Sequence, residues 1–206
     1  MTTTSSAGTR LRPRRADVRA QVVRAAAEAF AAQSYAEVSV TAIAAAAGFT
    51  KGAVYSNFGG KPQLFAAVFA EQFTALVGGA LRDALAAVDT PGSDAPRAVA
   101  ASLARGVVRG PLPGLLAEFR ALAARDPELA AVYSGLRLRQ RLELEELLGG
   151  VVDRLAVPAG LDLAVAATLL LTTVNSLAVE HATAPEAFPE PLVEAVLAHV
   201  MGGILA

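Results

Sequence analysis

The sequence lacks cysteine and tryptophan and contains two histidines among its 206 residues. Without cysteine there is no disulfide, no thiolate metal ligand and no cysteine nucleophile, which excludes redox chemistry on the protein itself and favours an intracellular protein. Aromatic residues make up 5% of the chain, whereas hydrophobic residues make up 54%. Much of that share is alanine, the best helix former, and strand-forming residues are few. Composition therefore predicts a soluble, all-α protein of one or two domains.

The sequence also lacks a convincing membrane segment or export signal. Its most apolar stretch, from Leu161 to Val179, is interrupted by polar residues, lacks close basic flanks and has no Trp or Tyr at its ends. This pattern favours a buried or interface helix over a membrane span. The Ser/Thr-rich residues 1–8 and the arginines after them lead into no uncharged apolar core. We therefore expect residues 1–13 to form a disordered basic tail on a cytoplasmic protein that makes no membrane contact.

Charge is distributed unevenly, although the net charge is only −1. Residues 1–62 carry eight basic and three acidic side chains, whereas residues 63–206 carry 10 basic and 16 acidic ones. A positive end joined to a negative body hints at a nucleic-acid-binding segment. The arginines from Arg10 to Arg15 are compatible with a solvated tail, or with an arm that follows the minor groove of DNA.

Hydrophobic periodicity and capping residues predict nine helices and no strand. Ser39, Thr50 and Asp126 are expected N-caps, Gly48 is expected to end a helix, and proline at position 62 suits a first helical turn. The predicted helices begin near residue 14 and then span about 40–46, 51–57, 61–88, 97–109, 115–125, 127–156, 161–181 and 191–205.

The second and third predicted helices, with Gly48 in the turn between them, have the spacing of a helix-turn-helix motif. The exposed side of the later helix is small or polar, which allows close approach to base edges. Lys51 is suited to guanine or phosphate, Asn57 to adenine, and the Tyr55 hydroxyl to phosphate. An ordinary three-helix core would have the same spacing, so spacing alone leaves both interpretations open.

The run from Ile43 to Leu64, IAAAAGFTKGAVYSNFGGKPQL, resembles the DNA-binding signature of TetR-family transcriptional regulators. The resemblance covers about the first 70 residues and departs from the family at Ser34, where glycine is frequent, and at Asn57, where histidine is common. It implies a DNA-binding domain over residues 14–70 and a ligand-binding and dimerisation domain over residues 71–206. The resemblance also implies that Thr41 and Thr50 lie at helix starts near DNA. It further implies that Lys51, Gly52 and Ala53 face the bases and that Tyr55, Asn57 and Lys61 face the phosphate backbone.

The body carries no recognisable catalytic or cofactor motif, so we predict no enzyme, no cofactor and no metal site. A pocket is expected among the helices that start near residues 97, 115, 127 and 161. Polar candidates for orienting a ligand are Thr172, Asn175, Glu180 and His181.

The favoured function is a homodimeric, ligand-responsive repressor of a pseudo-palindromic DNA operator, with an unidentified small-molecule effector. Two alternatives remain open. One is an activator of the same fold, and the other is an all-α small-molecule-binding or interaction protein that does not bind DNA.

Overall fold

The computed structural model describes residues 14–88, 94–110, 112–155 and 161–205. Over these ranges the chain forms nine α-helices and no strand, which confirms the all-α prediction. The predicted tail, residues 1–13, lies outside the described residues. The helices are α1 (Arg15–Ala32), α2 (Val40–Ala46), α3 (Lys51–Phe58), α4 (Lys61–Val88), α5 (Ala95–Arg109), α6 (Leu112–Ala123), α7 (Pro127–Leu155), α8 (Leu163–Thr183) and α9 (Glu190–Leu205).

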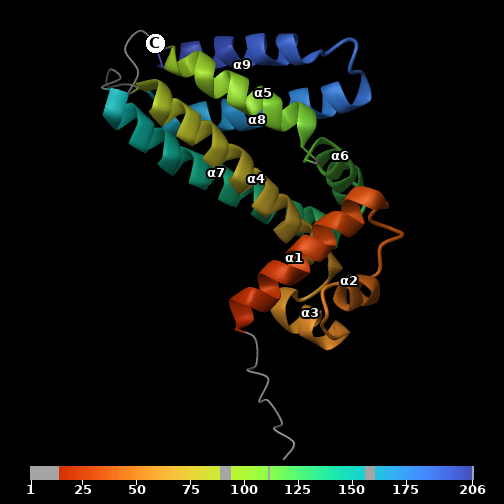
Figure 1. The fold of residues 1–206 in the computed structure, drawn as a ribbon. Coiled ribbons are helices and arrows are strands. Elements are labelled where there is room, and N and C mark those ends of the chain that lie inside the picture. Colours follow the sequence, from red (N-terminus) through yellow and green to blue (C-terminus); the bar gives the residue numbers. More distant parts are fainter. Residues whose placement is uncertain (1–13, 89–93, 111, 156–160, 206) are drawn as a thin grey trace, which may run out of the picture.

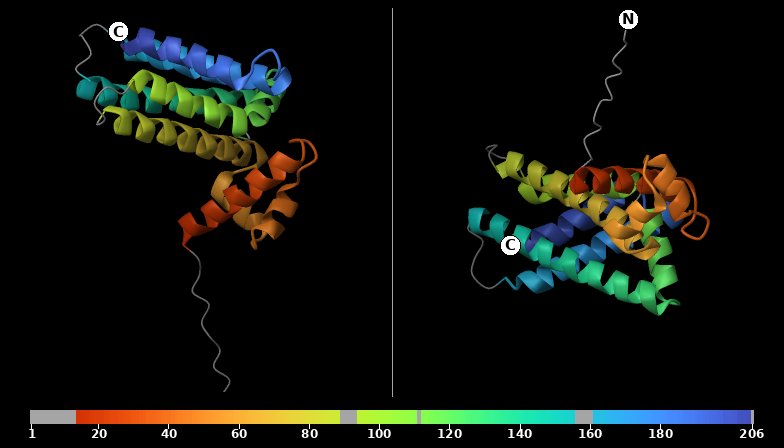
Figure 2. Two further views of the ribbon diagram at one scale, coloured as in Figure 1. Left: turned by 45° about the horizontal axis from the view of Figure 1, so that its top comes forward. Right: turned by 90° about the horizontal axis from the view of Figure 1, so that it is seen from below.

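The helices form a small lobe and a larger body (Figure 1). Helices α1, α2 and α3 make up the lobe together with the start of α4. Helix α4 continues without a break into the body, where it packs against α5 and α7. Helix α5 is packed between α4 and α9, and α8 contacts α6, α7 and α9. Figure 2 shows α9 on the side of the body away from the lobe.

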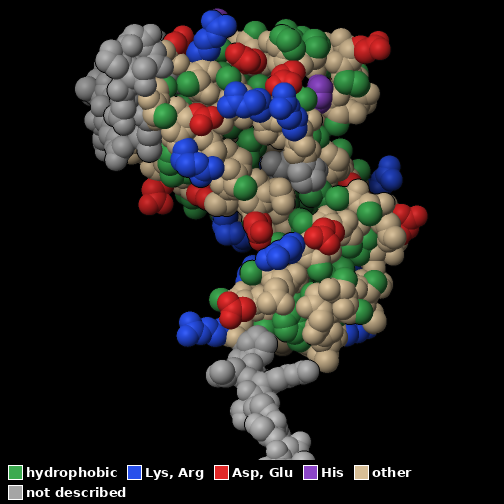
Figure 3. Space-filling model, viewed as in Figure 1, with side chains coloured by type: hydrophobic (Ala, Val, Ile, Leu, Met, Phe, Trp, Pro, Cys, Tyr) green, Lys and Arg blue, Asp and Glu red, His purple; other side chains and the backbone are tan. Residues whose placement is uncertain are grey.

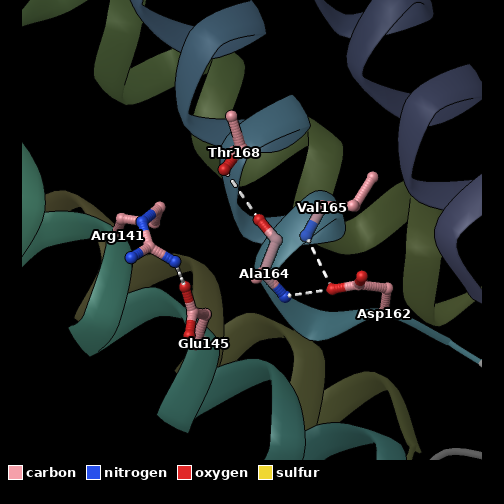
Figure 4. A network of polar contacts seen from close by, with 6 residues as sticks. All are labelled: Arg141, Glu145, Asp162, Ala164, Val165 and Thr168. Carbon is pink, nitrogen blue, oxygen red and sulfur yellow. Dashed lines mark hydrogen bonds and ion pairs between the residues drawn. The ribbon is translucent and has the colours of Figure 1, made fainter.

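Three predicted helices begin two or three residues from the expected position, and the first of them, α5, starts at Ala95 rather than near 97. Helix α6 starts at Leu112 rather than near 115, because a proline at position 113 fits the first helical turn, where its missing N–H is not needed. Helix α8 starts at Leu163 rather than 161, because Asp162 is its N-cap (Figure 4). The carboxylate of Asp162 accepts hydrogen bonds from the backbone N–H groups of Ala164, at 3.0 Å, and Val165, at 3.1 Å.

Buried apolar side chains form two clusters. The first cluster contains side chains from helices α1, α2, α3, α4 and α6 and from the start of α7, among them Phe65, Phe119 and Leu136. The second cluster joins the remainder of α4 with α5, α7, α8 and α9, and includes Leu144 and Leu197. The first cluster contains side chains from before and after residue 70, which lies inside α4. The lobe and the body therefore share part of their core.

Two helical segments, Lys61–Asp83 and Leu163–Thr183, are long and apolar enough to span a bilayer, each with a mean hydropathy of 1.6. Both contribute to the buried clusters: Phe69 and Phe73 come from the first segment, and Leu170 and Val174 from the second. Their apolar character is therefore accounted for by packing inside the helical body.

Candidate nucleic-acid interface

Helices α2 and α3 are each capped by a local hydrogen bond, and the turn between them contains a glycine. The Ser39 hydroxyl accepts a hydrogen bond from the N–H of Ala42 at 3.0 Å, and the Thr50 hydroxyl accepts one from the N–H of Ala53 at 3.2 Å. Gly48 has φ +77°, a left-handed conformation that favours glycine. These features confirm the predicted caps and the helix end, and they fix the position at which α3 begins.

Helix α3 has one buried and one exposed face. Val54 and Phe58 are buried in the first cluster, where they hold α3 against the lobe. Tyr55 is 44% exposed on the other face, and the Lys51 ammonium lies 5.6 Å from the centre of its ring. A cation and a phenol thus stand together on the solvent side of the helix. Of the other predicted contacts, Thr41, Thr50 and Gly52 are exposed and Ala53 is half-buried.

Asn57 is held by contacts within the lobe. Its amide N–H donates to the carbonyl oxygen of Ala53 at 2.7 Å, and its amide oxygen accepts from Nε of Arg15 at 3.3 Å. Both ends of the side chain therefore already have partners. A contact between Asn57 and DNA would have to add to these bonds or replace one of them.

Arg15 and Arg19 form a basic edge beside the carboxyl end of α3 that the sequence reasoning did not recognise. Arg15 donates to the carbonyl of Ser56 at 3.4 Å, and Arg19 to that of Asn57 at 3.5 Å. The Arg19 guanidinium also lies 4.6 Å from the centre of the Phe58 ring. Arg15 is the first residue of α1 and not part of an extended arm. The sequence signal was their spacing of four, which places both side chains on one helix face.

Positive charge is not confined to the lobe. On the face of the molecule in Figure 3, Lys and Arg side chains lie at the edges of the lobe and also over the body. The asymmetry in the sequence is therefore one of net balance, since acidic residues outnumber basic ones after residue 62.

Lys61 lies at the junction between lobe and body. Its ammonium is 4.4 Å from the centre of the Tyr35 ring, and burial lowers its pKa while the nearby Glu118 carboxylate acts in the opposite direction. The Glu118 carboxylate also accepts a hydrogen bond from the backbone N–H of Tyr35. Burial, with the carboxylates of Glu128, Asp126 and Glu118, raises the pKa of Tyr35 to about 12. The Lys61 ammonium therefore lies between the Tyr35 ring of the lobe and the charge of Glu118 on α6.

The four candidate ligand residues on α8 do not converge on one cavity. A cavity of about 430 Å³ lies where α1, α5, α6 and α8 meet, and His181 lines it together with Glu118 and Leu115. The His181 Nδ1 donates to the backbone carbonyl of Phe188 at 2.7 Å. Thr172 and Glu180 are exposed, and Asn175 is half-buried. Within the described residues no group of three His, Cys, Asp or Glu side chains is arranged to hold a metal ion.

Profiles of known families match both the lobe and the body. The profile of bacterial regulatory proteins of the TetR family matches residues 22–68, and the profile of the C-terminal domain of BetI-type transcriptional repressors matches residues 111–206. The chain belongs to the TetR family. Its helix-turn-helix is the DNA-binding element of this family, and its fold is that of transcriptional regulators. No curated protein sequence matches the chain.

Solved structures of low sequence identity share the fold. A TetR-family transcriptional regulator from Rhodococcus sp. has a TM-score of 0.71 at 15% identity, over 93% of this chain and 100% of the other. One from Mesorhizobium loti has a TM-score of 0.68 at 19% identity, over 94% and 98% of the two chains. The fatty acid degradation regulator FadR from Bacillus halodurans has a TM-score of 0.61 at 19% identity, over 91% and 96%. The similarity therefore extends over lobe and body together.

Proposed function

We propose that this TetR-family protein is a transcriptional repressor that binds a pseudo-palindromic operator as a homodimer and responds to a small molecule. The observation that carries the proposal is the exposed face of α3, which presents Lys51 and Tyr55 on a rigid helix-turn-helix. The match of residues 111–206 to repressors supports repression over activation. Such a protein acts where the operator is, in the cytoplasm.

The proposed DNA contacts follow the exposed geometry of the lobe. Lys51, Gly52 and Ala53 face base edges from the first turn of α3, where small residues permit close approach. Thr41 and Thr50, at the starts of α2 and α3, lie near the backbone, as helix N-termini favour phosphate. The remaining phosphate contacts are Tyr55, Asn57 and Lys61, to which the structure leads us to add Arg15 and Arg19.

Dimerisation is supported by exposed apolar side chains on the body. Of the six large hydrophobic residues exposed in the described part of the chain, Leu138 and Leu142 lie on α7 and Val165 and Leu169 on α8. A second copy of the chain would remove these side chains from water. Two recognition helices related by a two-fold axis then read two half-sites one helical turn apart. We accordingly assign DNA binding to residues 14–70 and ligand binding and dimerisation to residues 71–206.

A ligand would act by preferring one conformation of the dimer. A coupling free energy of about 1 to 3 kcal/mol changes operator affinity about 5- to 150-fold. The shared first cluster supports this coupling, since α6 and α7 of the body pack directly against the lobe. Operator affinity that is the same for every ligand complex and for free protein would contradict the ligand response.

The decisive experiment is selection of random duplex DNA by the purified protein at near-physiological salt. Wild type, the Lys51→Ala/Tyr55→Ala double variant and Arg82→Ala are compared, because Arg82→Ala also removes an exposed positive charge but from the distant part of α4. We expect wild type and Arg82→Ala to enrich the same two-fold symmetric site and the double variant to enrich none. Absence of enrichment by all three proteins would favour a binding protein that does not recognise DNA.

The effect of the protein on transcription distinguishes a repressor from an activator. Once the selected operator is known, transcription from a promoter that contains it is measured with and without the protein. We expect less transcript with the wild-type protein and no change with the double variant. An increase in transcript would identify an activator instead.

A further inference from the structure

A glutamine occupies the core of the body where the two apolar clusters meet. On α7, Leu136 belongs to the first cluster and Leu144 to the second, and Gln140 lies between them on the same helix face. Gln140 is 2% exposed and is the one buried polar or charged residue in the described part of the chain. An amide in this position has no access to bulk water to satisfy its hydrogen bonds.

One end of the Gln140 amide has no partner in the part of the chain that the structure describes. Its oxygen accepts a hydrogen bond from Nη1 of Arg137 at 3.0 Å, which fixes the orientation of the amide, since a guanidinium only donates. The amide nitrogen, Nε2, is buried without a hydrogen-bond partner among the described residues. Buried polar groups are nearly always paired, so Nε2 is a donor for which an acceptor is missing.

Arg137 adds an unneutralised positive charge beside this donor. Within the described ranges no carboxylate forms an ion pair with Arg137, whereas Arg141, one turn further along α7, is paired with Glu145 (Figure 4). Burial lowers the pKa of Arg137, Tyr133 acts in the opposite direction, and the positive charge of Arg120 lowers it further. The groups that act on the charge of Arg137 therefore include a second cation, Arg120, and no carboxylate of the described residues.

A second unpaired donor lies on α8, a helix that packs against α7. Nδ2 of Asn175 is buried and has no partner among the described residues. A Cβ at Gly149 would lie 3.5 Å from Leu163, which aligns the antiparallel helices α7 and α8 at these residues. The body thus contains two buried amide donors without a partner among the described residues, one on α7 and one on α8.

We propose that this site binds the carboxylate of an amphiphilic organic acid, with Gln140 Nε2 and Arg137 as its donors. A carboxylate supplies acceptor oxygens for both donors and one negative charge for one guanidinium. The apolar part of the acid lies among the leucines of the two clusters on either side of Gln140. The inference rests on the proposed ligand response and names the chemical class of the effector.

The test measures binding to the full-length protein in the absence of DNA. Octanoic, decanoic, dodecanoic and 4-phenylbutyric acids are titrated by calorimetry against the matched primary alcohols. Wild type is compared with Gln140→Leu and Arg137→Gln, and Arg139→Gln is the control because Arg139 is exposed on the same helix. We expect at least one acid to bind and its alcohol not to bind, with about tenfold or greater loss in the first two variants and none in the control.

Thermal unfolding separates loss of the site from loss of the fold. Gln140→Leu removes an unpaired buried donor, so we expect the ligand-free variant to unfold at or above the wild-type temperature and to lose the rise caused by the acid. Failure of every acid to bind wild type, or equal binding of acid and alcohol, would overturn the proposal. DNA binding is tested independently of this outcome, by titration with the selected operator. If an acid binds but leaves operator affinity unchanged, the proposed ligand response is overturned and the acid site is not.

Discussion

Ser34 and Glu37 close the turn that leads from α1 towards α2. The backbone N–H of Ser34 donates to the Glu37 carboxylate at 3.1 Å, and its hydroxyl donates to the same oxygen at 2.8 Å. These two hydrogen bonds lower the pKa of Glu37. Ser34 therefore has a specific role in this turn, because its hydroxyl supplies one of the two donors.

The lowered pKa makes the contribution of Glu37 to stability depend on pH. It is fully present above the ordinary pKa of 4.5 and is lost as pH falls through the lower value in the folded protein. We therefore expect Glu37→Gln to be less stable than wild type near neutral pH and the difference to shrink below about pH 4.5. Urea denaturation across this range measures it, with exposed Glu28→Gln as control. A difference that is constant with pH would contradict the assigned bonds.

Lys61 has two possible roles that salt dependence separates. If its ammonium reaches a phosphate while its stem remains against Tyr35, Lys61→Ala weakens binding to all sequences alike and flattens the slope of log affinity against log salt by about one unit. We expect this result, and we expect Lys51→Ala to reduce discrimination among bases as well. Titration of operator and scrambled duplexes over a salt series measures both. An unchanged slope would restrict Lys61 to the junction with the body.

At the scale of elements, local chemistry made most helices predictable. Ser39, Thr50 and Asp126 act as N-caps as their residue types and positions indicated, and α2 and α4 have the predicted bounds. The exposure of Lys51, Gly52 and Ser56 followed in the same way from helical periodicity, whereas Ala53 and Asn57, also expected to be exposed, are half-buried. The bonds of Asn57 to Arg15 and of Tyr35 to Glu118 did not follow, because they join residues 42 and 83 positions apart. Sequence periodicity contains no information on such contacts.

The cap at Thr50 connects helix stability with recognition. Thr50→Ala removes the acceptor for the Ala53 N–H, and loss of such a cap costs about 1 kcal/mol. We expect this loss in urea denaturation together with weaker operator binding, and we expect Thr50→Ser to restore both. Thr183→Ala is the control, because the Thr183 hydroxyl donates to a backbone carbonyl within α8 and caps no helix start. Equal destabilisation by both alanine variants would contradict the role of the cap.

At the scale of the whole molecule, aromatic rings connect the lobe to the body. Tyr35 and Phe65 have ring centres 5.1 Å apart, Phe65 and Phe119 5.0 Å, and Phe119 and Tyr133 5.3 Å. This series leads from the loop before α2 through α4 and α6 to α7. The lobe is therefore positioned by side chains that belong to the body, and a fragment that ends near residue 70 would lack part of its own core.

Substitution of Phe119 tests this dependence at a distance from DNA. Phe119 is fully buried, so Phe119→Ala is expected to lower the free energy of unfolding by about 3 to 5 kcal/mol. Because the lost contacts include Phe65 of the lobe, we also expect weaker operator binding well below the unfolding temperature. Leu197→Ala is the matched comparison: Leu197 is equally buried but belongs to the second cluster, and its loss costs about 2 to 5 kcal/mol. If the two variants, each folded at the assay temperature, bind operator equally well, the aromatic series contributes only to stability and the lobe is positioned by α4 alone.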